Sequence, residues 1–140
     1  MKDVLLMIDD IRRKGLYIKY RDKDLYINDD SLSFINKLCL NYGSTRKGRM
    51  ESYRYHFGKV NKVPIWVVND ICLFPIFAPK NKANIWFNAI QIVAATSINS
   101  HLTKVIFSNQ ESVIINTNIR TFNKQLLRAR DIIEVVYHLA

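Results

Sequence analysis

The sequence is poor in the residue types on which most catalytic and metal sites depend. It has two cysteines and three histidines in 140 residues, and His56, His101 and His138 stand far apart with no cysteine or carboxylate at metal-ligand spacing. Of its twelve acidic residues only five follow residue 30, and no nucleophile motif for acyl transfer is present. We therefore expect no enzyme, no metal site and no other cofactor.

Long apolar segments are also missing. No apolar run approaches the roughly 18 residues of a membrane span, and the apolar run near the N-terminus is too short for a secretory signal. We therefore expect a cytoplasmic protein without a membrane partner. Cys39 and Cys72 each lie between apolar residues, which favours buried, reduced thiols over a disulfide. The length suits a single domain over residues 1–140 with a sizeable core.

Positive charge is what the sequence has in excess. The formal net charge is +9, and residues 31–82 hold nine cations against two acids, whereas the first thirty residues are balanced. A surplus concentrated in the middle third favours nucleic acid or another anionic surface as the partner. The alternative is a basic protein whose charges serve only solvation.

One short segment carries much of this charge. Residues 42–49 read Tyr-Gly-Ser-Thr-Arg-Lys-Gly-Arg, with three cations, two hydroxyls and two glycines among eight residues. Glycine permits close backbone approach to a ligand, and Arg, Lys, Ser and Thr side chains bind phosphate, so we expect a basic loop that meets a polyanion. The glycine spacing resembles that of a nucleotide-binding phosphate loop. However, Arg49 and Met50 stand in place of the required Lys and Ser/Thr, which argues against nucleotide binding.

The apolar patterns predict an α+β fold of mostly antiparallel strands and hairpins, with one internal helix and a C-terminal helix. Asp30 caps the internal helix, whose apolar face includes Ile35 and Cys39, and Gly43 ends it. Strand-like runs predict hairpins over 16–27, 64–74 and 103–116 and a long strand over 85–95. Two further stretches, 4–13 and 50–57, fit either a strand or a helix.

The C-terminal helix is expected to begin at residue 118 or 121 and to end at residue 139. Its apolar stripe repeats at helical spacing and either completes the core or forms a dimer seam, of which we favour the core. The stripe consists of Phe122, Leu126, Ala129, Ile133 and Val136.

If the sheet gathers the basic loops at one end, they form a phosphate-binding face. Each cation taken alone is an ordinary solvated charge, but the charge asymmetry favours a collective site. The residues predicted to bind DNA are Ser44, Thr45, Arg46, Lys47, Arg49, Arg54, Lys59, Lys62, Lys80 and Lys82. Nearby aromatic residues could instead stack on unpaired bases, although core packing is favoured for both tryptophans. These aromatic residues are Tyr53, Tyr55, Trp66, Trp86 and Phe87.

An ordered series of motifs resembles a known family. The motifs are Cys-Leu-Asn-Tyr-Gly-Ser-Thr at 39–45 with Gly-Arg at 48–49, Lys-Val-Pro-Ile at 62–65, Leu-Phe-Pro at 73–75 followed by Pro79, Ile-Trp at 85–86, Val-Ile-Phe-Ser-Asn at 105–109, Thr-Phe at 121–122 and Gln-Leu-Leu-Arg-Ala at 125–129. Over about residues 34–130 the chain is similar to the ComK family of competence transcription factors of low-GC Gram-positive bacteria. The resemblance implies a transcriptional activator that recognises paired AT-rich boxes in double-stranded DNA, largely through the minor groove, as a multimer.

The minor groove of A-tracts suits the basic segment, because it is narrow, strongly negative and attractive to Arg and Lys. We expect Arg46 or Arg49 to enter it. The resemblance also implies a homo-oligomer and a regulatory adaptor protein of a protease, which in family members binds a tail beyond the C-terminal helix; this chain stops at Ala140. Two alternatives stay open, a protein-interaction module that modulates a related regulator and a single-stranded nucleic-acid binder.

Overall fold

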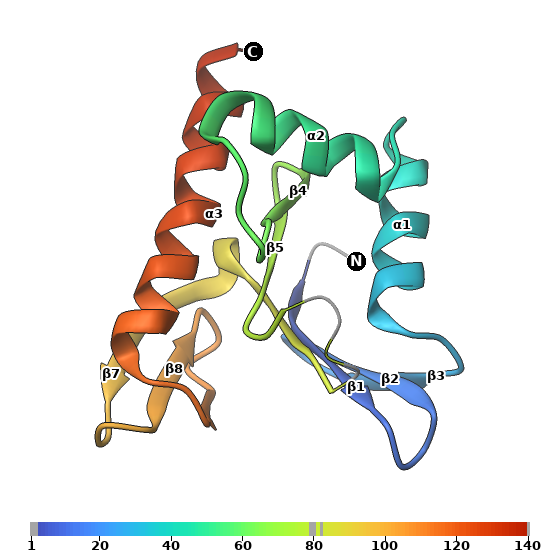
Figure 1. Ribbon diagram of the computed structural model, residues 1–140. Helices are drawn as coiled ribbons and strands as arrows, with labels where there is room; N and C mark the ends of the chain where they lie inside the picture. Colours follow the sequence, from blue (N-terminus) through green and yellow to red (C-terminus); the bar gives the residue numbers. More distant parts are fainter. Residues whose placement is uncertain (1–2, 79–80, 82, 140) are drawn as a thin grey trace.

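The computed structural model describes residues 3–78, 81 and 83–139 of the chain (Figure 1). The helices are α1 (Ser31–Asn41), α2 (Arg46–Phe57) and α3 (Ile119–Leu139), with a short 3-10 turn η1 (Ala89–Gln91). The strands are β1 (Val4–Asp10), β2 (Gly15–Tyr20), β3 (Asp24–Ile27), β4 (Ile65–Val68), β5 (Ile71–Pro75), β6 (Ile85–Asn88), β7 (Ile92–Ser97), β8 (Thr103–Phe107) and β9 (Ser112–Ile115). This order confirms the predicted α+β fold with a C-terminal helix.

The strands form two antiparallel sheets. The larger sheet has the order β3-β2-β1-β6-β5-β4 and the smaller one β7-β8-β9. The predicted hairpins are confirmed as β2–β3, β4–β5 and β8–β9. The ambiguous N-terminal stretch forms β1 in the interior of the larger sheet, where the first four residues of the strand are buried in succession. A continuous apolar run of this kind is what a strand covered on both faces requires.

The predicted long strand over 85–95 is wrong, because the chain changes from one sheet to the other after Asn88. This side chain is fully buried, and its amide nitrogen donates to the carbonyl oxygens of Val4 at 3.0 Å and Asp70 at 2.9 Å. Its amide oxygen accepts from the backbone nitrogen of Cys72 at 3.0 Å and also caps η1. A buried amide with these partners ends β6 and turns the chain into the smaller sheet.

One hydrophobic cluster joins both sheets and α3. At its centre, four phenylalanine rings from β5, β6, β8 and α3 contact one another with centroid distances between 5.4 and 5.9 Å. They are Phe74, Phe87, Phe107 and Phe122. Cys39 and Cys72 are buried free thiols, as the sequence indicates. Within the described ranges, no helix is long and apolar enough to cross a membrane.

Helix α3 completes this core, as favoured from the sequence. Phe122, Leu126 and Ala129 are buried, whereas Ile133 and Val136 are only partly buried. The next fully packed position is Ile132, one residue before the predicted one, because the buried face follows the sheets beneath the helix and not an ideal stripe.

The predicted basic loop is wrong in its second half, because α2 begins at Arg46. Thr45 caps the helix with its hydroxyl, which accepts from the backbone nitrogen of Gly48 at 2.9 Å. The amide oxygen of Asn36 on α1 accepts from the Arg46 backbone nitrogen, also at 2.9 Å. The helix then takes in the ambiguous residues 50–57 and ends at Gly58, which has φ +84°. The cations therefore stand on a helical turn and not on a flexible loop.

Candidate nucleic-acid interface

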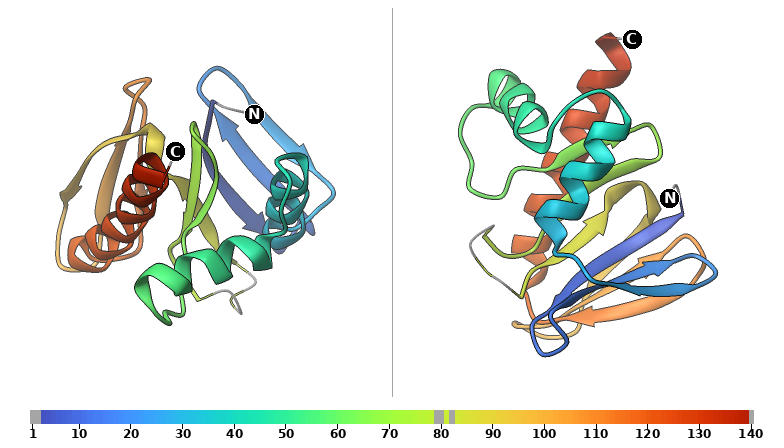
Figure 2. Two further views of the ribbon diagram at one scale, coloured as in Figure 1. Left: turned by 90° about the horizontal axis from the view of Figure 1, so that it is seen from above. Right: turned by 90° about the vertical axis from the view of Figure 1, so that its right-hand side faces the viewer.

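Helix α2 spans the space between α1 and α3 (Figures 1 and 2). Its N-terminus is tied to the middle of α1 through the Asn36–Arg46 contact. Its C-terminal end borders the second half of α3, where His56 and Phe57 share a groove with residues of that helix. Tyr53 is buried and fixes the inner face of α2 over β4. The opposite face of α2 is left to solvent.

The first turn of α2 holds cations where a helix normally prefers acids. Arg46, Lys47 and Arg49 lie in it, and no acidic residue does. The positive end of the helix dipole disfavours such cations by about 0.3–1 kcal/mol each at exposed positions. Side-chain charge and the helix dipole together make this end of α2 a place that favours an anion such as phosphate.

Arg49 is held in place within this turn. Its Nη2 donates to the carbonyl oxygen of Tyr42 at 3.2 Å, and its guanidinium carbon lies 5.0 Å from the centre of the Trp66 ring. Its Nε is buried and has no hydrogen-bond partner among the described residues. Arg46 is also partly engaged, because its Nη1 lies 3.1 Å from the sulfur of Met50. Of the three cations in this turn, Lys47 is the exposed one.

The field of these arginines reaches the end of α1. Burial raises the pKa of the Cys39 thiol, and the positive charges of Arg49 and Arg46 counteract part of this rise. The net pKa is still above the ordinary value, so the thiol stays protonated and acts as a packed apolar group.

The structure brings together only half of the predicted site. Ser44, Thr45, Arg46, Lys47 and Arg49 gather at the N-terminal end of α2. Arg54 is exposed two turns further along, and the connection from α2 to β4 places Lys59 and Lys62 after the other end of the helix. Helical rise separates Arg46 from Arg54 by about 12 Å. Lys80 and Lys82 lie outside the described residues.

The aromatic residues are mostly not available for base stacking. Tyr53, Trp86 and Phe87 are buried, so stacking on bases is wrong for these three. Trp66 is half-buried under Arg49. Tyr55 is the exception, because 85% of its surface is exposed on α2.

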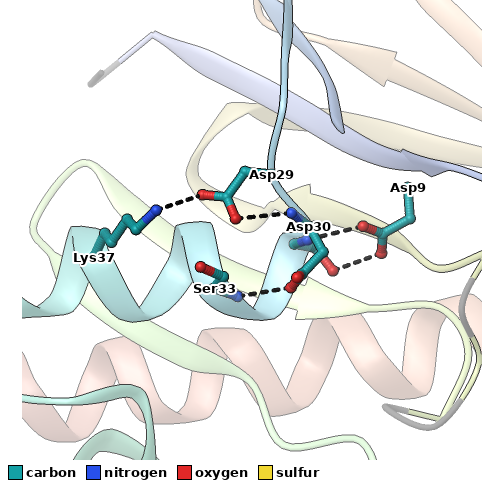
Figure 3. Close-up of polar contacts among 6 residues, drawn as sticks. Asp9, Asp29, Asp30, Ser33 and Lys37 are labelled. Carbon is teal, nitrogen blue, oxygen red and sulfur yellow. Dashed lines mark hydrogen bonds and ion pairs between the residues drawn. The ribbon is translucent and has the colours of Figure 1, made fainter. Parts of the chain in front are cut away.

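A second polar cluster, which the sequence did not single out, lies at the N-terminal end of α1 (Figure 3). Asp9 accepts from the backbone nitrogen of Ser31 at 2.8 Å and from its hydroxyl at 2.6 Å. Asp29 accepts from Lys37 at 3.0 Å, and Asp30 caps the helix through Ser33. The sequence signal for this cluster is two pairs of adjacent acids, one at the end of β1 (residues 9–10) and one just before α1 (residues 29–30).

The pKa values of Asp9 and Asp29 in this cluster are shifted in opposite directions. Burial raises the pKa of Asp9 despite the hydrogen bonds from Ser31. Burial acts in the same direction on Asp29, but the hydrogen bonds from Lys37, Ser33 and the Asp30 backbone, together with the charge of Lys37, outweigh it and lower the pKa of that carboxyl. The acids line a cavity of about 700 Å³, and within the described part of the chain no three His, Cys, Asp or Glu side chains are placed to hold a metal ion. Charge is thus segregated along α1, acidic at its start and basic beyond its end.

A family model described as ComK protein matches residues 8–138. The chain belongs to the ComK family. ComK proteins are competence transcription factors, and the family is one of transcriptional activators and not of enzymes. The match extends beyond the motif series at both ends and takes in the last three residues of β1 and nearly all of α3. Among curated proteins and among solved structures, none matches the chain significantly.

Proposed function

We propose that this ComK-family protein activates transcription in the cytoplasm by binding paired AT-rich boxes in double-stranded DNA, largely through the minor groove. The observation that supports this most is the set of cations in the first turn of α2, which the helix dipole disfavours and an anionic ligand compensates. A helix that is destabilised in this way by its own charges gains stability when DNA binds.

The proposed contacts follow from what each side chain offers. Lys47 and Arg54 are exposed on the outer part of α2 and reach phosphate, while the Ser44 and Thr45 hydroxyls stand near Lys47 at the start of the helix. Arg46 and Arg49 add positive charge behind this surface and provide the candidates for minor-groove insertion. Lys59 and Lys62 extend the contact beyond the helix, and Lys80 and Lys82 belong to the same proposed set.

Binding is tested by fluorescence anisotropy on two duplexes of equal length over several salt concentrations. One duplex carries two A/T tracts one helical turn apart, and the other is GC-rich. We expect tighter binding to the A/T duplex and a steep loss of affinity with salt, because phosphate contacts release counterions. Equal binding to both duplexes that disappears at physiological salt contradicts AT-box recognition.

A matched pair of variants locates the contact. Lys47→Ala with Arg54→Ala removes two exposed cations from α2, and Lys104→Ala removes an exposed cation from β8. We expect the α2 variant to bind the A/T duplex at least tenfold more weakly and with a shallower salt slope, and Lys104→Ala to bind like the wild type. Loss of affinity in both, in proportion to the number of cations removed, points to net charge alone.

The exposed Tyr55 ring supports one second candidate, single-stranded nucleic-acid binding. Base stacking on an aromatic side chain contributes about 1–3 kcal/mol per base. Tighter binding to poly(dT) than to either duplex, abolished by Tyr55→Ala, favours this candidate over the double-stranded one.

A further inference from the structure

The outward face of α3 carries an exposed stripe that the fold leaves uncovered. Helix α3 lies at the periphery of the molecule (Figures 1 and 2), and its inner face packs on β4, β5, β7 and η1. Leu127, Arg130, Glu134 and Tyr137 lie on the other side, spaced by three, four and three residues, so they are neighbours along one face. We call these four residues the α3 stripe.

The two apolar members of the α3 stripe are unusually exposed. Leu127 has 58% and Tyr137 68% of its surface open to solvent. A groove of about 440 Å³ borders the stripe at Glu134, and its lining includes Phe57 of α2, which is 39% exposed, and Val135. Apolar surface that is exposed together with an adjoining groove indicates a contact with another macromolecule.

The charged members of the stripe are free to pair with a partner. Arg130 forms no hydrogen bond or ion pair within the described residues. The Oε1 atom of Glu134 lies 3.8 Å from Nε2 of His138, and both side chains are strongly exposed. A contact this long between exposed groups contributes little and is easily exchanged.

The order of chemistry along the stripe makes it complementary to itself. It runs apolar, positive, negative, aromatic from Leu127 to Tyr137. When a second α3 lies antiparallel to the first, Arg130 of each copy faces Glu134 of the other, and Leu127 faces Tyr137. A parallel arrangement would set Arg130 against Arg130. The antiparallel arrangement has two-fold symmetry, in which one patch contacts the same patch on the other copy.

We propose that the α3 stripe is the seam between two copies of this chain, packed antiparallel about a two-fold axis. The proposal rests on the proposed function in one respect, since paired DNA boxes need two copies held together. Three turns of one helix make a small interface, so the dimer is weak in free solution. Two adjacent boxes on one DNA raise the local concentration of the second copy and strengthen the pairing.

The test measures self-association of the full chain by sedimentation velocity without DNA. Arg130→Glu and Glu134→Arg each set like charges against each other at both ends of the symmetric seam. We expect each variant to self-associate at least about tenfold more weakly than the wild type. Mixing the two variants pairs opposite charges across the seam again, so we expect mixed dimers at close to wild-type strength.

The mixture separates the seam from any effect within one helix, because mixing cannot repair a defect inside a single chain. Lys104→Glu makes the same charge reversal on β8 and serves as the matched control, expected to associate like the wild type. Circular dichroism establishes that each variant is folded, and Leu127→Gln, which weakens the apolar contact without a charge change, replaces any variant that is not.

Three results overturn the proposal. The first is a wild type that stays monomeric at its highest soluble concentration, and the second is a pair of variants that associate like the wild type or fail to associate when mixed. The third is weaker DNA binding of Arg130→Glu with unchanged self-association, which makes the stripe a DNA contact. Because the readout contains no DNA, failure of AT-box recognition leaves the seam standing, and loss of the seam leaves binding to a single box standing.

Discussion

The guanidinium group of Arg49 lies over the indole ring of Trp66, with its central carbon 5.0 Å from the ring centre. The same group donates to the carbonyl oxygen of Tyr42, just beyond the end of α1. One side chain therefore joins α1, α2 and β4. A residue that charge alone assigns to DNA contact also holds the candidate interface in position.

Replacement of Arg49 by Ala is expected to lower the free energy of unfolding by about 1–3 kcal/mol, because it removes a half-buried cation–π contact and a charged hydrogen bond. Arg49→Lys keeps the charge but not the planar stacking, and we expect an intermediate loss. Thermal unfolding followed by circular dichroism measures both. Arg54→Ala, at an exposed position on the same helix, is the control and should stay within about 0.5 kcal/mol of the wild type. Equal stability of Arg49→Ala and Arg54→Ala would remove the structural role of the stack.

Asn88 gives a larger expected effect. Asn88→Ala removes the side-chain partner of four backbone groups in three chain segments: that of Val4 in β1, those of Asp70 and Cys72 in the β4–β5 hairpin, and that of Ile90 in η1. We expect a loss of about 3 kcal/mol or more, because buried backbone groups lose hydrogen bonds that water cannot replace. Urea unfolding measures it, with the exposed Asn123→Ala on α3 as the matched control. A loss below about 1 kcal/mol would show that the neighbouring backbone finds other partners.

This position also shows why part of the fold could not be predicted from the sequence. The hairpins and α1 could be predicted, because their signals are local: alternating apolar residues, turn residues, an Asp cap and a terminal glycine. The change of sheet at Asn88 could not, because residues 85–95 are apolar enough for one strand. What interrupts them is a set of hydrogen-bond partners that lie far away in the chain.

The candidate site divides in the same way. Clustering of cations in residues 42–49 could be predicted by reading the charges, and the Thr45 cap is a local signal as well. The helix that follows could not, because Gly48 and cations near the positive end of the dipole both disfavour it. Contacts with Asn36 and Trp66 outweigh these local preferences, and neither contact is visible before the fold is known.

Asp9 and Asp29, which lie near the start of α1, are expected to make pH-dependent contributions to stability of opposite sign. Because the pKa of Asp9 is raised above its ordinary 3.8, the folded protein binds this proton more tightly than the unfolded chain. Relative to Asp9→Asn, the wild type therefore gains stability as the pH falls through the raised pKa, and the gain is complete below 3.8. The pKa of Asp29 is lowered, so its contribution is present above 3.8 and is lost as the pH falls through the lowered value.

Chemical denaturation of the two variants and the wild type between neutral and acid pH measures both effects. We expect the stability difference for Asp29→Asn to shrink toward acid pH, while Asp9→Asn falls behind the wild type over the same range. Parallel curves for the wild type and Asp9→Asn at every pH would contradict the raised pKa of Asp9.

Thr45 separates the stability of α2 from its proposed contact with DNA. Thr45→Ala removes the acceptor for the Gly48 backbone nitrogen and should lower the free energy of unfolding by about 1 kcal/mol. Thr45→Asp retains a capping oxygen and adds a negative charge that suits the helix dipole, so its stability should equal or exceed that of the wild type. The same negative charge stands where phosphate is proposed to lie, so the Asp variant should bind the A/T duplex at least tenfold more weakly.

Thermal unfolding and anisotropy on the same samples measure both quantities, with Asp30→Ser, a cap exchange at the other end of α1, as the control. If Thr45→Asp is stable and binds DNA like the wild type, the N-terminal end of α2 does not face the phosphates.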